Sequence, residues 1–155
     1  MRDWGKQMMK LKLTATIALL TVPLLLGGCA SNGYGIAALK APAGPKDVVP
    51  EDVKLPFLEQ VDATTLRFLV EEDGRQYFAA QSTDGAQACL AVFHLDQQIT
   101  DYAGCAVAAG SSSNKIVTVS GTDRRPAALV RDNADTAQLE SEGLRRIHQN
   151  VYVGE

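Results

Sequence analysis

An apolar run of 14 residues, 13–26, carries no charge and limits which part of this chain can fold. A helix that spans a membrane needs roughly 20 apolar residues, so the run is too short to be a comfortable anchor. Four basic residues precede it within residues 1–12, against the single acidic residue Asp3. This arrangement predicts an export segment, residues 1–28, that is cleaved off, so the folded part begins beyond Cys29.

The end of the run, residues 24–29 (LLLGGC), resembles the lipobox of bacterial lipoproteins. It has a leucine three residues before the cysteine and a glycine directly before it. The resemblance implies that Cys29 is lipidated and holds the protein at the extracytoplasmic side of the cell membrane. The alternatives are an ordinary signal peptide or an uncleaved anchor, in which Cys29 is incidental. Translation from Met8 or Met9 in place of Met1 leaves Cys29 where it is.

Removal of residues 1–28 also changes the charge balance of the chain. It leaves 11 basic and 17 acidic residues, a net charge of −6. The overall field of an acidic domain does not attract nucleic acid, anionic lipid or anionic wall polymers. We therefore expect no nucleic-acid partner, and the remaining length predicts one small domain.

The chain has three cysteines, and the lipobox accounts for one of them. In an oxidising exported setting the other two, Cys89 and Cys105, most simply form a disulfide. The alternatives are a redox pair or a metal site. A redox pair usually has Cys-x-x-Cys spacing, and a zinc site needs further ligands. Since neither pattern is present, we expect a structural disulfide and no metal or cofactor.

Composition divides the rest of the chain into a tether and a domain. Residues 30–50 are rich in Ala, Gly and Pro and have no sustained period, which is typical of a flexible tether. Apolar residues return over 51–61 and predict an arm that lies against the domain. We therefore expect a lipidated N-terminus with a flexible tether and arm over 29–61, and an extracytoplasmic domain over 62–155.

Strand signals dominate the predicted domain. Alternating and β-branched residues indicate strands, and the Asp-Gly turn at Asp84 indicates a tight reversal between two of them. The fold class expected is mainly β: a small antiparallel sheet, sandwich or barrel of about six strands with one short helix. The expected strands cover 65–71, 76–81, 86–94, 115–120, 127–131 and 146–153, and the expected helix covers 135–142.

Several short motifs follow one another in the predicted domain. A Cys-Leu strand follows the Asp-Gly turn, the second cysteine comes 16 positions later, and the strands VTVSG and NVYV complete the series. In this order the motifs resemble small lipoproteins of high-GC Gram-positive bacteria, over roughly residues 62–153. The resemblance implies an envelope setting and no particular reaction.

The residues that carry chemistry are few. His94 ends an apolar strand two residues before Asp96, and such a pair occurs in metal sites and nucleophilic triads. A hydrated pair at the end of a strand is the plainer interpretation and is preferred. Ser112 and Lys115 have the Ser-x-x-Lys spacing of serine acyl-transfer enzymes. They lie in a polar loop that lacks the helical frame which would activate the lysine.

Arg124 and Arg125, with Arg131 near them in sequence, are a candidate pocket for a carboxylate or phosphate. A hydrated turn is the preferred interpretation of this pair. We therefore predict a non-enzymatic lipoprotein that supports an envelope process or contacts an envelope protein, with a sheet edge or the polar loop SSSN as the contact surface. The alternatives are a small-ligand-binding lipoprotein and, ranked third, an envelope hydrolase.

Overall fold

The computed structural model describes residues 34–49, 53, 56–96, 100–107 and 114–155. Two four-stranded antiparallel sheets make up the domain, in the orders β1-β2-β3-β4 and β5-β6-β8-β7. The strands are β1 (Val61–Glu72), β2 (Arg75–Ser82), β3 (Gln87–His94), β4 (Tyr102–Val107), β5 (Lys115–Ser120), β6 (Pro126–Val130), β7 (Leu144–His148) and β8 (Val151–Gly154). The helices are the 3-10 helices η1 (Ala37–Lys40) and η2 (Pro56–Gln60) and the α-helix α1 (Ala137–Ser141).

The predicted fold class is confirmed: the domain is mainly β and antiparallel, with one α-helix and the Cys89–Cys105 disulfide. Its described residues form eight strands, where the sequence predicted about six. Strand β4 falls in the stretch after His94, for which the sequence predicts no element. The single closing strand expected over 146–153 is a hairpin, β7 and β8.

Asn150 explains why the last segment turns. Its side chain is fully buried, and its Nδ2 donates hydrogen bonds to the Val130 carbonyl at 3.1 Å and to Asp132 Oδ1 at 2.8 Å. Both partners are remote in the sequence, so these tertiary bonds hold Asn150 at the turn between β7 and β8. The alternating residues on either side of Asn150 therefore pair with each other across the turn.

The main core lies between the two sheets. Strand alternation directs Ala88, Leu90 and Val92 of β3 toward it, opposite Leu129 of β6 and Val151 of β8. The other face of β3 is also shielded from solvent, because η2 and the residues that precede it cover the first sheet. Strands β2 and β3 are consequently buried on both faces.

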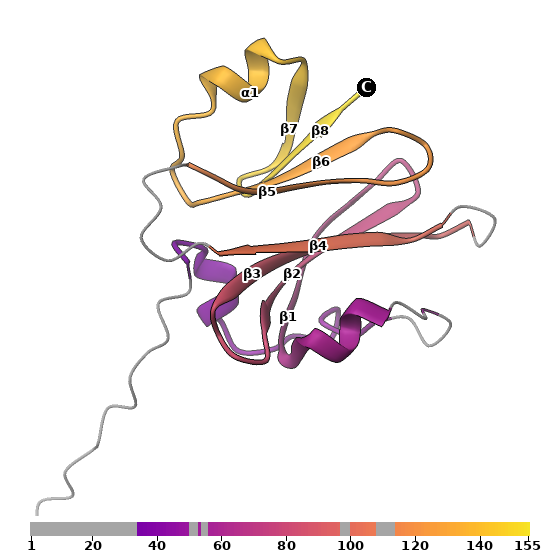
Figure 1. The fold of residues 1–155 in the computed structure, drawn as a ribbon, viewed down its shortest axis with the longest axis vertical. Helices are drawn as coiled ribbons and strands as arrows, with labels where there is room; N and C mark the ends of the chain where they lie inside the picture. The colour runs from indigo at the N-terminus through magenta and orange to yellow at the C-terminus, as the bar shows by residue number, and fades with distance from the viewer. Residues whose placement is uncertain (1–33, 50–52, 54–55, 97–99, 108–113) are drawn as a thin grey trace, which may run out of the picture.

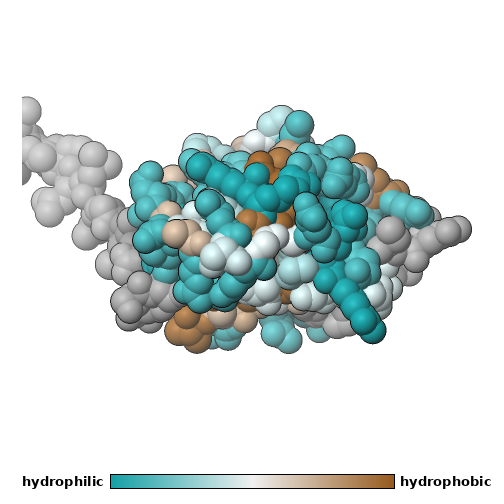
Figure 2. All heavy atoms as spheres, turned by 90° about the horizontal axis from the view of Figure 1, so that it is seen from above, coloured by the Kyte–Doolittle hydropathy of each residue, from teal (hydrophilic) through white to brown (hydrophobic). Residues whose placement is uncertain are grey.

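Helix α1 covers the outer face of the second sheet. Leu139 inserts from α1 among Ala128, Val130 and Tyr152. Figure 1 shows the resulting layers, from α1 at the top through the two sheets to η2 at the bottom. The face seen from above in Figure 2 is mainly hydrophilic, with small apolar areas among the polar residues. In the described part of the chain, no helix combines the length and apolar character needed to cross a membrane.

The residues that precede η2 are partly packed into the core, contrary to the predicted flexible tether. Residues 30–50 were expected to be a flexible tether, but Tyr34, Ile36 and Leu39 are buried between the sheets, with 5%, 0% and 5% of their surface exposed. Three apolar residues within six positions are too few to give a sequence period, although each fills the core. The packed domain therefore extends to Tyr34 and does not begin at residue 62.

Candidate functional site

Three polar residues with largely buried side chains meet at one end of the sandwich. Arg75 begins β2 and His94 ends β3, and the two are direct partners in the sheet register. Asp123 comes from the turn between β5 and β6, in the other sheet. The Arg75 guanidinium donates from Nη2 to Asp123 Oδ2 at 2.7 Å and from Nε to His94 Nε2 at 3.1 Å. We call these three residues the polar cluster.

Burial sets the electrostatics of the polar cluster. The side chains of Arg75, His94 and Asp123 are 9%, 2% and 19% exposed. Burial raises the pKa of the Asp123 carboxyl, but hydrogen bonds from the Arg125 amide and the Arg75 guanidinium outweigh it and, with the charge of Arg75, hold the pKa below its ordinary value. Asp123 is therefore a carboxylate, and its charge neutralises that of Arg75 in a site that largely excludes solvent.

The imidazole of His94 is held in one orientation. Its Nε2 accepts the Arg75 hydrogen bond, so the proton of the neutral ring is assigned to Nδ1. That Nδ1 lies 3.6 Å from Asp101 Oδ1, which accepts a 2.7 Å hydrogen bond from the His94 backbone amide. Among the described residues, Nδ1 itself has no hydrogen-bond partner.

Tyr102 closes one side of the polar cluster. Its ring centroid lies 5.7 Å from that of His94, and its hydroxyl donates to the Arg125 carbonyl at 3.2 Å. Burial raises the pKa of the phenol, and the Asp123 carboxylate raises it further. A Cβ at Gly121 would lie 2.5 Å from the Tyr102 ring, so only glycine lets the β5–β6 turn approach so closely.

An outer set of ion pairs surrounds the polar cluster at the surface. Arg145 Nη1 on β7 lies 2.8 Å from Glu72 Oε1, and Arg145 Nη2 lies 3.5 Å from Asp73 Oδ2. Arg125 Nη1 lies 3.7 Å from the same Asp73 oxygen. These pairs join the β1–β2 turn to the second sheet. Because their side chains are exposed to solvent, these pairs contribute little to stability.

The geometry of the polar cluster does not support nucleophilic catalysis. A histidine base must accept a proton at a free ring nitrogen from a nearby nucleophile. In His94, Nε2 already accepts from a guanidinium, and the ring is almost fully buried. In the described ranges, moreover, no group of three or more His, Cys, Asp or Glu side chains is placed to hold a metal ion. The polar cluster instead fastens the two sheets together.

The structure places the predicted site residues in separate parts of the fold. His94 is not the hydrated partner of Asp96, because it is buried and its nearest acids are Asp101 and Asp123. Arg124 and Arg125 do lie on an exposed turn, as the preferred interpretation held. Arg131 lies at the opposite end of β6 from them, where its Nη1 donates to the Tyr34 carbonyl at 2.7 Å. The structure therefore does not assemble an arginine pocket.

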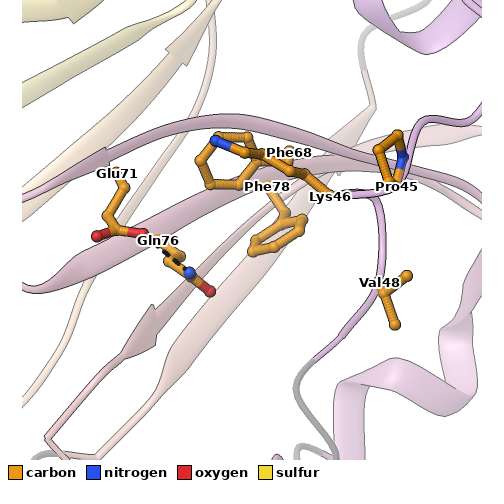
Figure 3. A pocket seen from close by; sticks show the side chains of 7 residues that line it. All are labelled: Pro45, Lys46, Val48, Phe68, Glu71, Gln76 and Phe78. Carbon is orange, nitrogen blue, oxygen red and sulfur yellow. Dashed lines mark hydrogen bonds between the residues drawn. The ribbon is translucent and has the colours of Figure 1, made fainter.

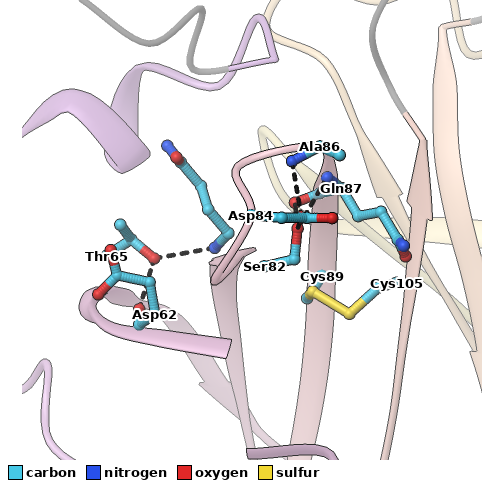
Figure 4. Close-up of a disulfide and its surroundings, with 9 residues drawn as sticks. Asp62, Thr65, Ser82, Asp84, Ala86, Gln87, Cys89 and Cys105 are labelled. Carbon is cyan, nitrogen blue, oxygen red and sulfur yellow. Dashed lines mark hydrogen bonds between the residues drawn. A yellow bond between two sulfur atoms is a disulfide. The ribbon is translucent and has the colours of Figure 1, made fainter. Parts of the chain in front are cut away.

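The disulfide joins two directly paired residues. Cys89 on β3 and Cys105 on β4 are register partners, with their Cα atoms 4.0 Å apart (Figure 4). The predicted Cys89–Cys105 bond is confirmed, and Cys89 is 1% exposed. It fixes the edge strand β4 to the centre of the first sheet. Cys29 and Ser112 lie outside the described residues, and Lys115 begins β5.

A hollow of about 270 Å³ lies on the outer side of the first sheet (Figure 3). The Phe68 and Phe78 rings form an edge-to-face pair, with centroids 5.5 Å apart. Lys46 Nζ lies 5.1 Å from the centroid of the Phe68 ring, and Gln76 Nε2 donates to Glu71 Oε2 at 3.0 Å. The full lining is Pro45, Lys46, Val48, Phe68, Glu71, Gln76 and Phe78. The hollow thus has aromatic walls, a cation and a carboxylate.

Asp47 occupies the free edge of the first sheet beside this hollow. Its Oδ1 accepts a hydrogen bond of 2.7 Å from the Phe68 amide of β1. Since a strand that adds to a sheet needs such edge amides, this position on β1 is closed to a partner strand. A sheet edge was expected as a contact surface, and β1 does not offer one here.

Sequence reasoning singled out His94 but missed Arg75, Asp123 and Tyr102. Of these three, Arg75 could have been found from the sequence through the register of the hairpin. In a hairpin turned at residues 83–86, the register that pairs Ser82 with Gln87 also pairs Arg75 with His94. Asp123 and Tyr102 come from elements that are remote in the sequence, so no local pattern indicates them.

Replacing Asp123 with asparagine should lower the free energy of unfolding by about 1.5 kcal/mol near neutral pH, because it removes the charge from a partly buried hydrogen bond to Arg75. The folded pKa of Asp123 is depressed, so its contribution is complete above the unfolded value near 3.8 and is lost as pH falls through the folded pKa. Urea titrations of wild type and Asp123→Asn from pH 7 to pH 2 measure this. A difference between the two proteins that stays constant down to pH 2 would contradict the depressed pKa.

The fold and this site define a disulfide-linked antiparallel β domain whose two sheets are joined by a buried polar cluster. No protein family matches the chain, and comparisons with curated proteins and with solved structures also give no match.

Proposed function

We propose that this chain is a lipid-anchored extracytoplasmic protein whose β domain serves as a non-enzymatic interaction module at the membrane. The observation that carries the proposal is the sequence LLLGGC at the end of a short apolar run, which offers Cys29 for acylation. Two or three acyl chains hold a protein on a bilayer where one gives only weak binding. The anchor in this proposal is the lipid on Cys29.

Two structural features support the proposed setting and role. The Cys89–Cys105 disulfide suits an oxidising compartment, since such bonds are rare where thiols are kept reduced. The titratable groups of the polar cluster are engaged with one another, which favours a module that binds over one that catalyses. The partner proposed is another protein of the envelope.

Replacing Cys29 with alanine tests the anchor. The variant should be released from membranes or should accumulate unprocessed, and it should lose acyl labelling, because the proposed lipid is attached through this cysteine. Asn32→Ala is the matched control, since it changes the same stretch and keeps the cysteine. Fractionation and labelling with an acyl-chain analogue measure the outcome. Normal acyl labelling of Cys29→Ala would overturn the lipid anchor.

Photocrosslinking in intact cells tests the interaction role. A photoreactive residue at an exposed position of the anchored protein should capture a protein neighbour reproducibly. The same residue at a buried position such as Leu90, which is 0% exposed, is the control and should capture none. Recovery of lipid alone from every exposed position would count against an interaction module.

The hollow beside Phe68 favours a second candidate, a small-ligand-binding lipoprotein. Its volume of about 270 Å³ is just below the 300–1,000 Å³ usual for small-molecule sites. Its aromatic walls, Lys46 and Glu71 suit a small molecule that carries both apolar and charged groups. Thermal-shift titration with a metabolite collection tests this candidate. Saturable stabilisation that is abolished by Phe68→Ala would place ligand binding first.

A further inference from the structure

The point where the chain enters the packed domain is fixed. Tyr34 is 5% exposed, and its hydroxyl donates to the Gly85 carbonyl in the β2–β3 turn. Its own carbonyl accepts the bond from Arg131, and the Gly35 carbonyl accepts one from the Asp132 amide at 2.7 Å. Residues from two turns therefore hold this stretch of chain at one end of the sandwich, which we call the near end.

The distance from the near end to Cys29 is short along the chain. Only residues 30–33 lie between Cys29 and Tyr34 in the sequence. An extended chain covers at most about 3.6 Å per residue, so the five steps from Cys29 to Tyr34 reach no more than about 18 Å. A tether over 30–50 would have allowed several times this reach. The burial of Tyr34 and Ile36 removes most of that freedom.

The polar cluster lies at the opposite end, which we call the far end. Strand β3 runs from Gln87, beside the β2–β3 turn, to His94 in the polar cluster. At about 3.4 Å per residue, its seven steps separate the two ends by roughly 24 Å. Figure 1 shows η1 at the left of the sandwich and the β5–β6 turn at the right.

Charge opposes an arrangement in which the domain lies flat on the bilayer. From Cys29 on, the chain has 11 basic and 17 acidic residues. Anionic lipid headgroups repel such a domain, and attraction to a bilayer requires clustered Lys and Arg. The short connection therefore draws only the near end to the membrane.

We infer that the near end, formed by the β2–β3 turn and the turn after β6, is a bilayer-facing surface. The far end, with the ion pairs of Asp73, Arg125 and Arg145, is then presented to the aqueous side. This inference rests on the proposed acylation of Cys29. It names the lipid surface as the partner of the near end and leaves the far end for a protein partner.

Energy transfer to labelled lipid headgroups tests this orientation. Thr83 and Thr122 are a matched pair, because both are exposed threonines in turns, one at each end. Thr83→Cys and Thr122→Cys each add one free thiol for a donor dye, since Cys89 and Cys105 are bonded to each other and an acylated Cys29 has no free thiol. The lipidated full chain is placed in vesicles that contain an acceptor-labelled lipid.

The donor at residue 83 should show at least about twofold more transfer than the donor at residue 122, given the 24 Å between the ends. Inserting 20 Gly/Ser residues after Asn32 should abolish most of this difference, because a flexible segment of that length reaches about 25 Å. Equal transfer at both sites in protein that floats with the vesicles would overturn the orientation alone. Protein that does not float would overturn the lipid anchor, and the orientation with it.

Discussion

Replacing Ile36 with alanine should lower the free energy of unfolding by about 2–5 kcal/mol. Ile36 is 0% exposed and packs in the cluster between the two sheets, although it lies 25 positions before the first residue of β1. The substitution removes buried carbon atoms and leaves a cavity that the two sheets cannot close without moving. Urea denaturation followed by far-UV circular dichroism measures the change.

Val48→Ala is the matched control for Ile36→Ala. Val48 lies on the same N-terminal stretch but is 66% exposed, so its replacement should change stability by no more than about 0.5 kcal/mol. If both variants lost less than about 1 kcal/mol, residues 34–40 would not be part of the core. That result would return this stretch to the role of a tether, and would also remove the basis for a short connection to the membrane.

Removing the disulfide should cost about 3 kcal/mol. The double variant Cys89→Ala/Cys105→Ala opens a loop whose ends are 16 residues apart, and in the chain-entropy picture such a loop restricts the unfolded chain by about that amount. The bond also holds β4, an edge strand, to β3. Urea denaturation of the oxidised wild type and of the double variant measures the difference.

Wild type treated with a reductant is the control for the double variant. It should move toward the stability of the double variant, while the double variant should not respond to the reductant. A denaturation midpoint that is the same in all four conditions would show that Cys89 and Cys105 are not joined in the exported protein.

The sequence predicted strands β1 to β3 well, for a physical reason. Strands β1 to β3 are joined by tight turns that contain Gly74 or Gly85, both with positive φ, and such turns set the register of their neighbours. The disulfide followed from counting cysteines and from the expected compartment. These predictions depended on interactions that are local or covalent.

The missed features depend on contacts between distant parts of the chain. Tyr34 and Ile36 are buried because they fill space between the two sheets. A short apolar series in the sequence does not indicate that such a space exists. The sequence indicates that a strand ends at His94, as β3 does, but it suggests Asp96 as the acid beside the ring. Its actual acid neighbour in the other sheet, Asp123, becomes close only when the two sheets pack together.

The contacts of the near end also affect the order in which the domain can fold. The Ala37 amide donates to Asp132, 95 residues later, and Arg131 reaches Tyr34 across 97 residues. Closing such long loops is entropically costly and slows folding. During synthesis from the N-terminus, Tyr34 and Ile36 leave the ribosome early. They cannot reach their native contacts until almost the whole domain has been synthesised. The residues nearest the proposed anchor are therefore among the last to reach their native contacts.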